Sequence, residues 1–243
     1  MKRVVVATIC CDFKAYSLWR VVERNLALET PNGLQKIVYI NIQDGGTVDW
    51  RWLDEYPDVM VDRWTWESDW LEERRFDQDQ GHRLTPICLA RNMARYFAIS
   101  AQAEALMYVD SDVLVPQESL RVLFYEELRP VVGGLVPGRG AHSHVHYTGS
   151  GRRHRKLGTN VLEVDYGTAG FLLLRRPVFE IVSWRWGMSR NPQERGEWIS
   201  EDPLYAEDAR ALGFGWWHIR TDLKAEHIDH PDRPLTEDGA AEF

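Results

Sequence analysis

Two aspartates stand directly after a run of apolar residues, in the segment "EALMYVDSDVLVP" (residues 104–116). Side chains at positions i and i+2 of a strand point to the same side, so Asp110 and Asp112 face one point if strand geometry persists. Two close carboxylates repel each other, and a divalent cation such as Mg²⁺ or Mn²⁺ offsets that repulsion through oxygen ligands. Such a cation holds a diphosphate and stabilises it as a leaving group. The alternative is that both aspartates are turn and capping residues before a helix at Pro116.

The elements that would position these carboxylates alternate between strand and helix. Apolar runs predict buried strands at residues 3–9 and 36–42, a short strand at 58–64, a strand over "ALMYVDSD" at 105–112 and, within 160–176, one or two more strands. Helices are predicted from spacing and end signals at residues 16–29, 85–103, 116–128 and 201–213. We expect Thr85 to cap the second helix, with Pro86 at its first position, and Gly213 to end the last one. This order predicts an α/β fold with a mostly parallel central sheet, helices on its faces, a mixed second half, and sites at the carboxyl ends of strands.

Length, net charge and cysteine content narrow the classes of protein to which the chain can belong. The chain has 243 residues, which suits one domain, and no stretch approaches the roughly 20 apolar residues that cross a bilayer. Its net charge of -8 argues against a broad nucleic-acid surface, which is normally basic. The three cysteines, Cys10, Cys11 and Cys88, form no disulfide framework, so we expect a reducing, cytoplasmic compartment.

The order of motifs resembles the GT-A glycosyltransferases, and most closely their large inverting group called family 2. The features that carry the resemblance are, in chain order, "NIQDGGTVD", "LARNMARYFAIS", "LMYVDSD", "YGTAGFLLLRRPVFE", "SEDPLYAEDARALGF" and "KAEHID". They cover roughly residues 3 to 230, and their order and spacing are more specific than any one of them. The resemblance implies one Rossmann-like GT-A domain over residues 1–243. It would have a nucleotide-binding half at 1–115, an acceptor half at 116–230 and a tail at 231–243.

The same resemblance implies residues for the donor. Thr8, Asp44, Arg91 and Asp110 would lie by the nucleotide or its diphosphate, and Gly170 would let the backbone approach the donor sugar. Asp44 has a plainer interpretation as a turn residue before two glycines, and Arg91 as a solvated residue on a helix face. A uridine diphosphate sugar is the expected donor at the level of the family.

The resemblance also implies metal ligands and a base. Asp110, Asp112 and His227 would hold Mn²⁺ or Mg²⁺, which would let an anionic protein bind an anionic donor. Asp202 would be the general base that removes a proton from the acceptor hydroxyl, with Glu201 as the rival for this role. The alternative is that both acids favour a helix N-terminus through its dipole, and this is compatible with catalysis.

Two further segments bear on the acceptor. Residues 139–158 are rich in Arg, Lys and His and predict a loop that contacts an anionic substrate, or else a solvated loop. Trp64, Trp66 and Trp70 have the chemistry to stack on a sugar, although packing against the sheet edge is the simpler interpretation.

The sequence leaves several functions open. The first is a metal-dependent glycosyltransferase that acts on a glycan, a small molecule or, in a narrower version, a modified DNA base. A non-catalytic nucleotide- or sugar-binding protein is the alternative from another class. A nucleotidyltransferase is disfavoured, because "ATICCDFKAY" has no glycine where such enzymes carry a glycine-rich turn. An Asp202 base favours inversion, although retaining GT-A enzymes share the D-x-D pattern.

Overall fold

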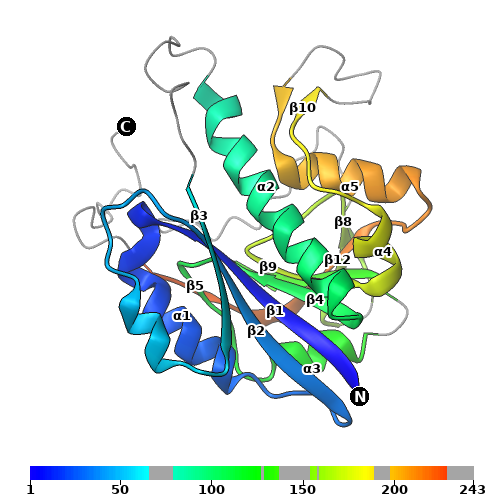
Figure 1. Ribbon diagram of the computed structural model, residues 1–243. Helices are drawn as coiled ribbons and strands as arrows, with labels where there is room; N and C mark the ends of the chain where they lie inside the picture. Colours follow the sequence, from blue (N-terminus) through cyan, green and yellow to red (C-terminus); the bar gives the residue numbers. More distant parts are fainter. Residues whose placement is uncertain (66–78, 127–128, 137–153, 158, 189–197, 229–243) are drawn as a thin grey trace, which may run out of the picture.

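The computed structural model describes residues 1–65, 79–126, 129–136, 154–157, 159–188 and 198–228. Within these ranges a nine-stranded sheet runs in the order β3-β2-β1-β4-β9-β6-β12-β8-β7, with helices on both of its faces (Figure 1). Strands β3, β2, β1, β4, β6 and β12 share one direction, and β9 and β8 run against them. The mostly parallel α/β fold expected from the sequence is therefore confirmed.

The bounds of the elements follow the predicted apolar runs closely in the first half. The sheet strands are β1 (Lys2–Cys11), β2 (Leu34–Gln43), β3 (Val59–Trp64), β4 (Ala103–Val109), β6 (Val131–Leu135), β7 (His154–Lys156), β8 (Val161–Val164), β9 (Phe171–Arg175) and β12 (Trp217–Lys224). Two small pairs are β5 (Val113–Leu114) with β13 (Glu226–His227), and β10 (Gly187–Met188) with β11 (Trp198–Ile199). The helices are α1 (Ala15–Ala27), α2 (Asp79–Ser100), α3 (Ser119–Phe124), α4 (Arg176–Ile181) and α5 (Glu201–Ala211), with 3₁₀ turns at Asp12–Lys14 and Arg51–Glu55.

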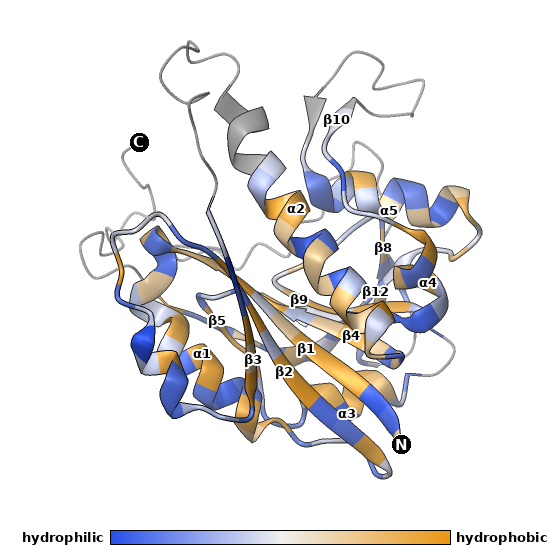
Figure 2. Cartoon of the chain, in the orientation of Figure 1, coloured by the Kyte–Doolittle hydropathy of each residue, from blue (hydrophilic) through white to orange (hydrophobic). Residues whose placement is uncertain are grey.

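Successive side chains of the central strands point to opposite faces of the sheet, so the core has one part on each face. On β4, Leu106 and Tyr108 pack with α2, α4 and α5, whereas Met107 and Val109 pack with α1 and α3. A strand covered on both faces needs apolar residues at every position, and Figure 2 shows the central strands in orange accordingly. The continuous apolar run before Asp110 is thus the signature of a strand in the middle of the sheet.

Three predicted boundaries are wrong. Helix α2 begins at Asp79 and carries Pro86 in its interior, so Thr85 does not cap it; instead the Thr85 hydroxyl accepts a hydrogen bond from Trp186 Nε1 at 2.7 Å. The helix expected at 116–128 shrinks to α3, six residues long. Within the predicted loop 139–158, His154–Lys156 form β7, because the edge of β8 offers backbone partners.

The remaining expectations concern the end of α5, three tryptophans and the loop at 139–158. Gly213 follows α5 with φ of +86°, the left-handed conformation predicted for a helix-ending glycine. Trp64 ends β3 and donates its indole N–H to Asn41 Oδ1 at 2.7 Å, while Trp66, Trp70 and residues 137–153 lie outside the described residues. No helix among the described residues is long and apolar enough to cross a membrane.

Candidate active site

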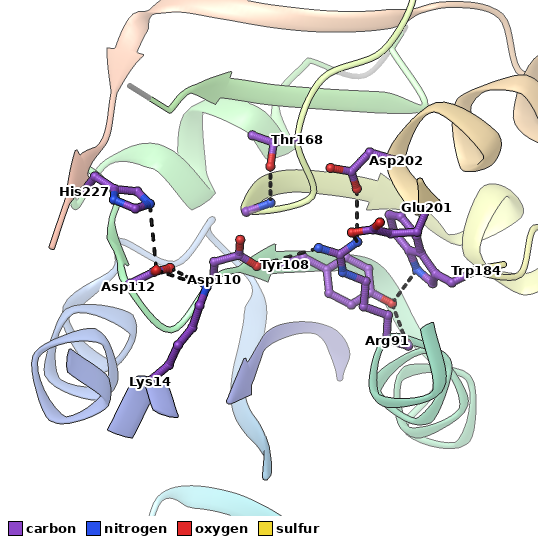
Figure 3. Close-up of polar contacts among 11 residues, drawn as sticks. Lys14, Arg91, Tyr108, Asp110, Asp112, Thr168, Trp184, Glu201, Asp202 and His227 are labelled. Carbon is purple, nitrogen blue, oxygen red and sulfur yellow. Dashed lines mark hydrogen bonds and ion pairs between the residues drawn. The ribbon is translucent and has the colours of Figure 1, made fainter. Parts of the chain in front are cut away.

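The predicted acidic residues gather where β4 ends. The strand stops at Val109, and Val113 N–H donates to Asp110 C=O at 3.1 Å, which closes a turn over residues 110–113. Strand geometry therefore does not persist through the D-x-D segment, and its two carboxylates join different groups. Figure 3 shows Asp110 between these groups, with Lys14, Asp112 and His227 on one side and Arg91, Glu201 and Asp202 on the other.

The first group is centred on Arg91, which is a buried residue of α2 rather than a solvated one. Its Nη1 donates to Glu201 Oε1 at 2.9 Å and to Asp202 Oδ1 at 3.0 Å, and its Nη2 lies 3.8 Å from Asp110 Oδ1. The side chain is only 5% exposed. One guanidinium thus balances three carboxylates, one from the turn after β4 and two from the first turn of α5.

An aromatic cluster fixes the position of this guanidinium. Arg91 lies 4.7 Å from the ring centroid of Trp184, and Trp184 stacks on Tyr205 at 4.0 Å. The Tyr108 hydroxyl donates to the Arg91 carbonyl at 2.8 Å and accepts from Trp184 Nε1 at 3.1 Å. Asn92 holds the Trp184 backbone through two hydrogen bonds, at 2.8 and 2.9 Å. The cation is therefore held on a rigid, apolar base, and its direction toward the carboxylates is set before any ligand binds.

Burial changes the proton affinities in this group. Loss of hydration raises the pKa of Asp202 to about 7, with Glu201 and Asp110 also raising it and Arg91 opposing them. Arg91 itself loses hydration, but the neighbouring carboxylates outweigh this loss and raise its pKa, so it stays charged. Burial also raises the pKa of the nearby Cys88 thiol to about 12, which disfavours a thiolate nucleophile there. Asp202 is thus a carboxylate whose proton affinity suits proton transfer near neutral pH.

Gly170 shapes the space around Asp110. A Cβ at this glycine would lie 2.8 Å from Asp110 Oδ2 and 3.1 Å from its Cγ. The Gly170 carbonyl accepts from Asp110 N–H at 3.1 Å, and Gly170 N–H donates to Thr168 Oγ1 at 3.0 Å. The missing side chain therefore makes room for the Asp110 carboxylate, a constraint separate from the predicted approach to a donor sugar.

The second group is centred on Asp112, whose side chain is 1% exposed. Lys14 Nζ lies 3.1 Å from Asp112 Oδ1 and 3.0 Å from Oδ2, and His227 Nε2 lies 3.8 Å from Oδ2. Lys14 ends the 3₁₀ turn that directly follows β1. The structure thus brings Asp112 and His227 together as expected, but it adds a lysine that pairs with the same carboxylate.

The position of His227 beside Asp112 depends on the pairing of two strands that are distant in sequence. Strand β13 pairs with β5, with His227 opposite Val113, and Ile228 N–H donates to the Asp112 carbonyl at 2.7 Å. The Tyr16 hydroxyl of α1 donates to the Ile228 carbonyl at 3.3 Å. These bonds fasten the segment against Asp112 and fix the imidazole beside the carboxylate.

Two predicted donor residues, Thr8 and Asp44, contact neither of these groups in the bonds that the structure gives them. Thr8 is completely buried, and its hydroxyl accepts from Asn25 Nδ2 of α1 at 2.9 Å, which is a packing role. Asp44 Oδ1 accepts from Gly46 N–H at 2.8 Å, which is the turn geometry of its plainer interpretation. The loop after β2 is also held by Asp12, which accepts from Gly45 N–H at 3.0 Å and from Thr47 N–H at 2.8 Å.

The metal expected from the sequence can be tested against this donor set. Among the described residues, no three metal-ligating side chains cluster together. Asp112 Oδ2 and His227 Nε2 are 3.8 Å apart, so both can lie at the bonding distance of about 2.1 Å from one small cation. Mg²⁺-type sites commonly combine one or two protein ligands with water and substrate phosphates. The pair therefore fits a metal that a diphosphate completes, whereas Asp110 is directed to Arg91.

Lys14 and Trp184 are site residues that sequence reasoning missed. Lys14 had a usable signal, since it is a basic residue in the turn after the first strand, where many α/β folds bind phosphate. Trp184 had none, because an isolated tryptophan in "VSWRW" reads as ordinary packing.

Comparison with known proteins supports the fold. No protein-family model matches the sequence, and no curated protein matches it. Among solved structures, S. aureus TarS 1–349 in complex with UDP is 15% identical with a TM-score of 0.52, over 92% of this chain and 60% of that one. The complex with UDP-GlcNAc gives 14% identity and a TM-score of 0.51, over 95% and 60%.

This chain spans only 60% of the TarS fragment it matches. A197 from STIV aligns over 98% of this chain and 91% of its own, at 14% identity and a TM-score of 0.47. The likeness shows that this chain shares the α/β fold of TarS.

Proposed function

We propose that this protein transfers a sugar from a nucleotide-sugar, a uridine diphosphate sugar in the first instance, to an acceptor hydroxyl. The observation that carries the proposal is the Asp202 carboxylate, half-buried and held together with Glu201 on one guanidinium, at the strand edge that also carries Asp110 and Asp112. Ligands of α/β sheets bind at this edge. The shared fold of TarS, which binds UDP and UDP-GlcNAc, supports the choice of donor.

The cations of the site suit an anionic donor in a protein of net charge -8. Lys14 and Arg91 flank Asp110 on opposite sides, so a diphosphate near Asp110 lies within the field of both (Figure 3). We further propose that Asp112 and His227 hold Mn²⁺ or Mg²⁺ when the donor is bound. Such an ion would supply Lewis-acid stabilisation of the departing diphosphate.

Asp202 acts as the general base in this proposal. As the acceptor oxygen attacks the anomeric carbon, the bond from that carbon to the diphosphate oxygen breaks, and the hydroxyl proton passes to Asp202. A pKa of about 7 leaves a large share of Asp202 deprotonated at neutral pH while keeping it basic enough to accept the proton. Arg91 holds the carboxylate in place through its bond at 3.0 Å. One displacement at the face opposite the leaving group inverts the anomeric centre, as in the family 2 group.

A matched pair of variants tests this assignment. Asp202→Asn and Glu201→Gln each remove one charge from the first turn of α5, and both side chains contact Arg91 Nη1. We expect both variants to bind UDP nearly as the wild type does, by calorimetry. We expect Asp202→Asn to lose about 100-fold or more in UDP release from UDP-GlcNAc in the presence of an acceptor panel, with a smaller loss for Glu201→Gln.

Two results would overturn parts of the proposal. Unchanged turnover in Asp202→Asn with loss in Glu201→Gln would transfer the base to Glu201. UDP and UDP-sugar binding without turnover, in the wild type and with every acceptor offered, would favour a non-catalytic nucleotide-sugar-binding protein. Absence of any nucleotide binding would remove the proposed donor site altogether.

A further inference from the structure

Lys14 occupies both oxygens of the carboxylate that is expected to bind metal. Its Nζ lies 3.1 Å from Asp112 Oδ1 and 3.0 Å from Oδ2, while Asp112 is almost completely excluded from solvent. A buried carboxylate needs a compensating charge, and here the chain supplies that charge itself.

The three side chains differ in how firmly they are held. Asp112 is fixed by its own carbonyl bond to Ile228 N–H, and His227 by the pairing of β13 with β5. Lys14 lies outside any strand, and its long side chain is 32% exposed, so its ammonium has a path to solvent. Of the three groups, the ammonium is the one that can move without breaking backbone pairing.

A lysine ammonium and a divalent cation exclude each other at this position. Both require the Asp112 oxygens, and two cations held close together in a poorly hydrated site repel strongly. A divalent cation that binds Asp112 and His227 must therefore displace Lys14. The displaced ammonium needs a new anionic partner, and a phosphate group beside Asp112 provides one.

We propose that Lys14 is an internal cation that competes with divalent metal for Asp112, and that a nucleoside diphosphate releases the site by pairing with Lys14. The second half of this statement rests on the proposed donor site, whereas the competition itself does not. Metal affinity and nucleotide affinity are then linked, because each ligand favours the same displaced position of Lys14.

Binding of Mn²⁺ alone tests the competition. Free Mn²⁺ is followed by electron paramagnetic resonance during titration of the wild type, Lys14→Met and Lys14→Arg, without nucleotide. We expect Lys14→Met to bind one Mn²⁺ about tenfold or more tightly than the wild type, and Lys14→Arg, which keeps the positive charge, to behave like the wild type. The double variant Lys14→Met/Asp112→Asn should lose the gained site. Equal Mn²⁺ binding by the wild type and Lys14→Met overturns the proposal.

A second arm compares Mn²⁺ binding with and without UDP, and its first half needs only the unaltered protein. Addition of UDP should strengthen Mn²⁺ binding to the wild type about tenfold or more, and much less in Lys14→Met. Tight Mn²⁺ binding to the wild type that UDP leaves unchanged would refute the linkage. If UDP does not bind but Lys14→Met still gains a Mn²⁺ site, the proposed function fails while the competition stands. If UDP binds but Lys14→Met gains no Mn²⁺ affinity, the competition fails while the proposed donor site stands.

Discussion

Replacement of Arg91 by methionine removes the cation that, among the residues the structure describes, contacts Asp110, Glu201 and Asp202 together. Methionine keeps an apolar stem over Trp184 but leaves the partly buried carboxylates without this counter-ion. Removal of one partner of a buried ion pair costs about 3–5 kcal/mol. We expect a loss of this size in the free energy of unfolding at neutral pH, measured by urea denaturation.

The pH dependence of that loss identifies its cause. The folded-state pKa of Asp202 is raised to about 7, above its usual value, so this group stabilises the protein at acid pH and loses that stabilisation as pH rises toward 7. Arg91 lowers this pKa, and its removal should raise it further. Each unit of further rise costs about 1.4 kcal/mol once the pH exceeds the new pKa. The defect of Arg91→Met should therefore be smaller near about pH 5.5 than near about pH 9, where the carboxylates are charged.

Arg95→Met is the matched control, one turn along the same helix. Arg95 is also buried, at 7% exposure, but its guanidinium donates to the backbone carbonyls of Phe179 and Glu180. Those acceptors do not titrate, so its loss of about 1–3 kcal/mol should be the same at both pH values. If the defect of Arg91→Met is as independent of pH as that of Arg95→Met, the assigned charge balance is wrong.

Three further predictions concern glycines and proton transfer. Gly170→Ala should push the Asp110 carboxylate away from Arg91 and weaken UDP binding about tenfold, as measured by calorimetry. The free energy of unfolding should fall by less than about 1 kcal/mol, because the partly exposed carboxylate can rotate toward solvent. Gly134→Ala should do the opposite, with a loss of about 1–3 kcal/mol in urea denaturation and unchanged UDP binding, because its Cβ would lie 1.9 Å from the buried Phe171 ring. The kcat/KM for transfer should rise with pH through about 7 as Asp202 loses its proton, and this limb should be absent from the residual activity of Asp202→Asn.

Local sequence patterns predicted the elements but not all of their ends. The apolar runs of β1, β2 and β4 located the centre of the sheet, since strands covered on both faces leave an unbroken signal. The start of α2 was predicted wrongly from Pro86. Proline lacks a backbone N–H and is therefore most often found in the first turn of a helix. Here the helix extends beyond the proline toward its N-terminus and begins at Asp79.

The sequence pattern singled out the acids of this cluster and Arg91, but not Lys14 and not which cation pairs with which acid. Asp110, Asp112, Asp202 and Glu201 stand at strand or helix ends, where a local pattern marks them. The partners of these acids are distant in sequence: Lys14 is 98 residues from Asp112, and Arg91 is 111 residues from Asp202. Such pairs depend on the order of strands in the sheet, which a single sequence does not encode in any local period.

The raised pKa of Asp202 also predicts opposite effects of one substitution on stability and on activity. An ionised Asp202 is unfavourable in the folded state above about pH 7, because burial removes its hydration. Asparagine has the same shape and carries no charge to bury, so Asp202→Asn should unfold at a higher urea concentration than the wild type near about pH 8, and its advantage should shrink toward about pH 4. The gain is at most about 4 kcal/mol, since the pKa rises by roughly three units from 3.8 and Arg91 loses one of its partners. If Asp202→Asn is less stable than the wild type near about pH 8, the ionised carboxylate stabilises the fold through Arg91. Asp202 would then not be a destabilising group that is retained for proton transfer.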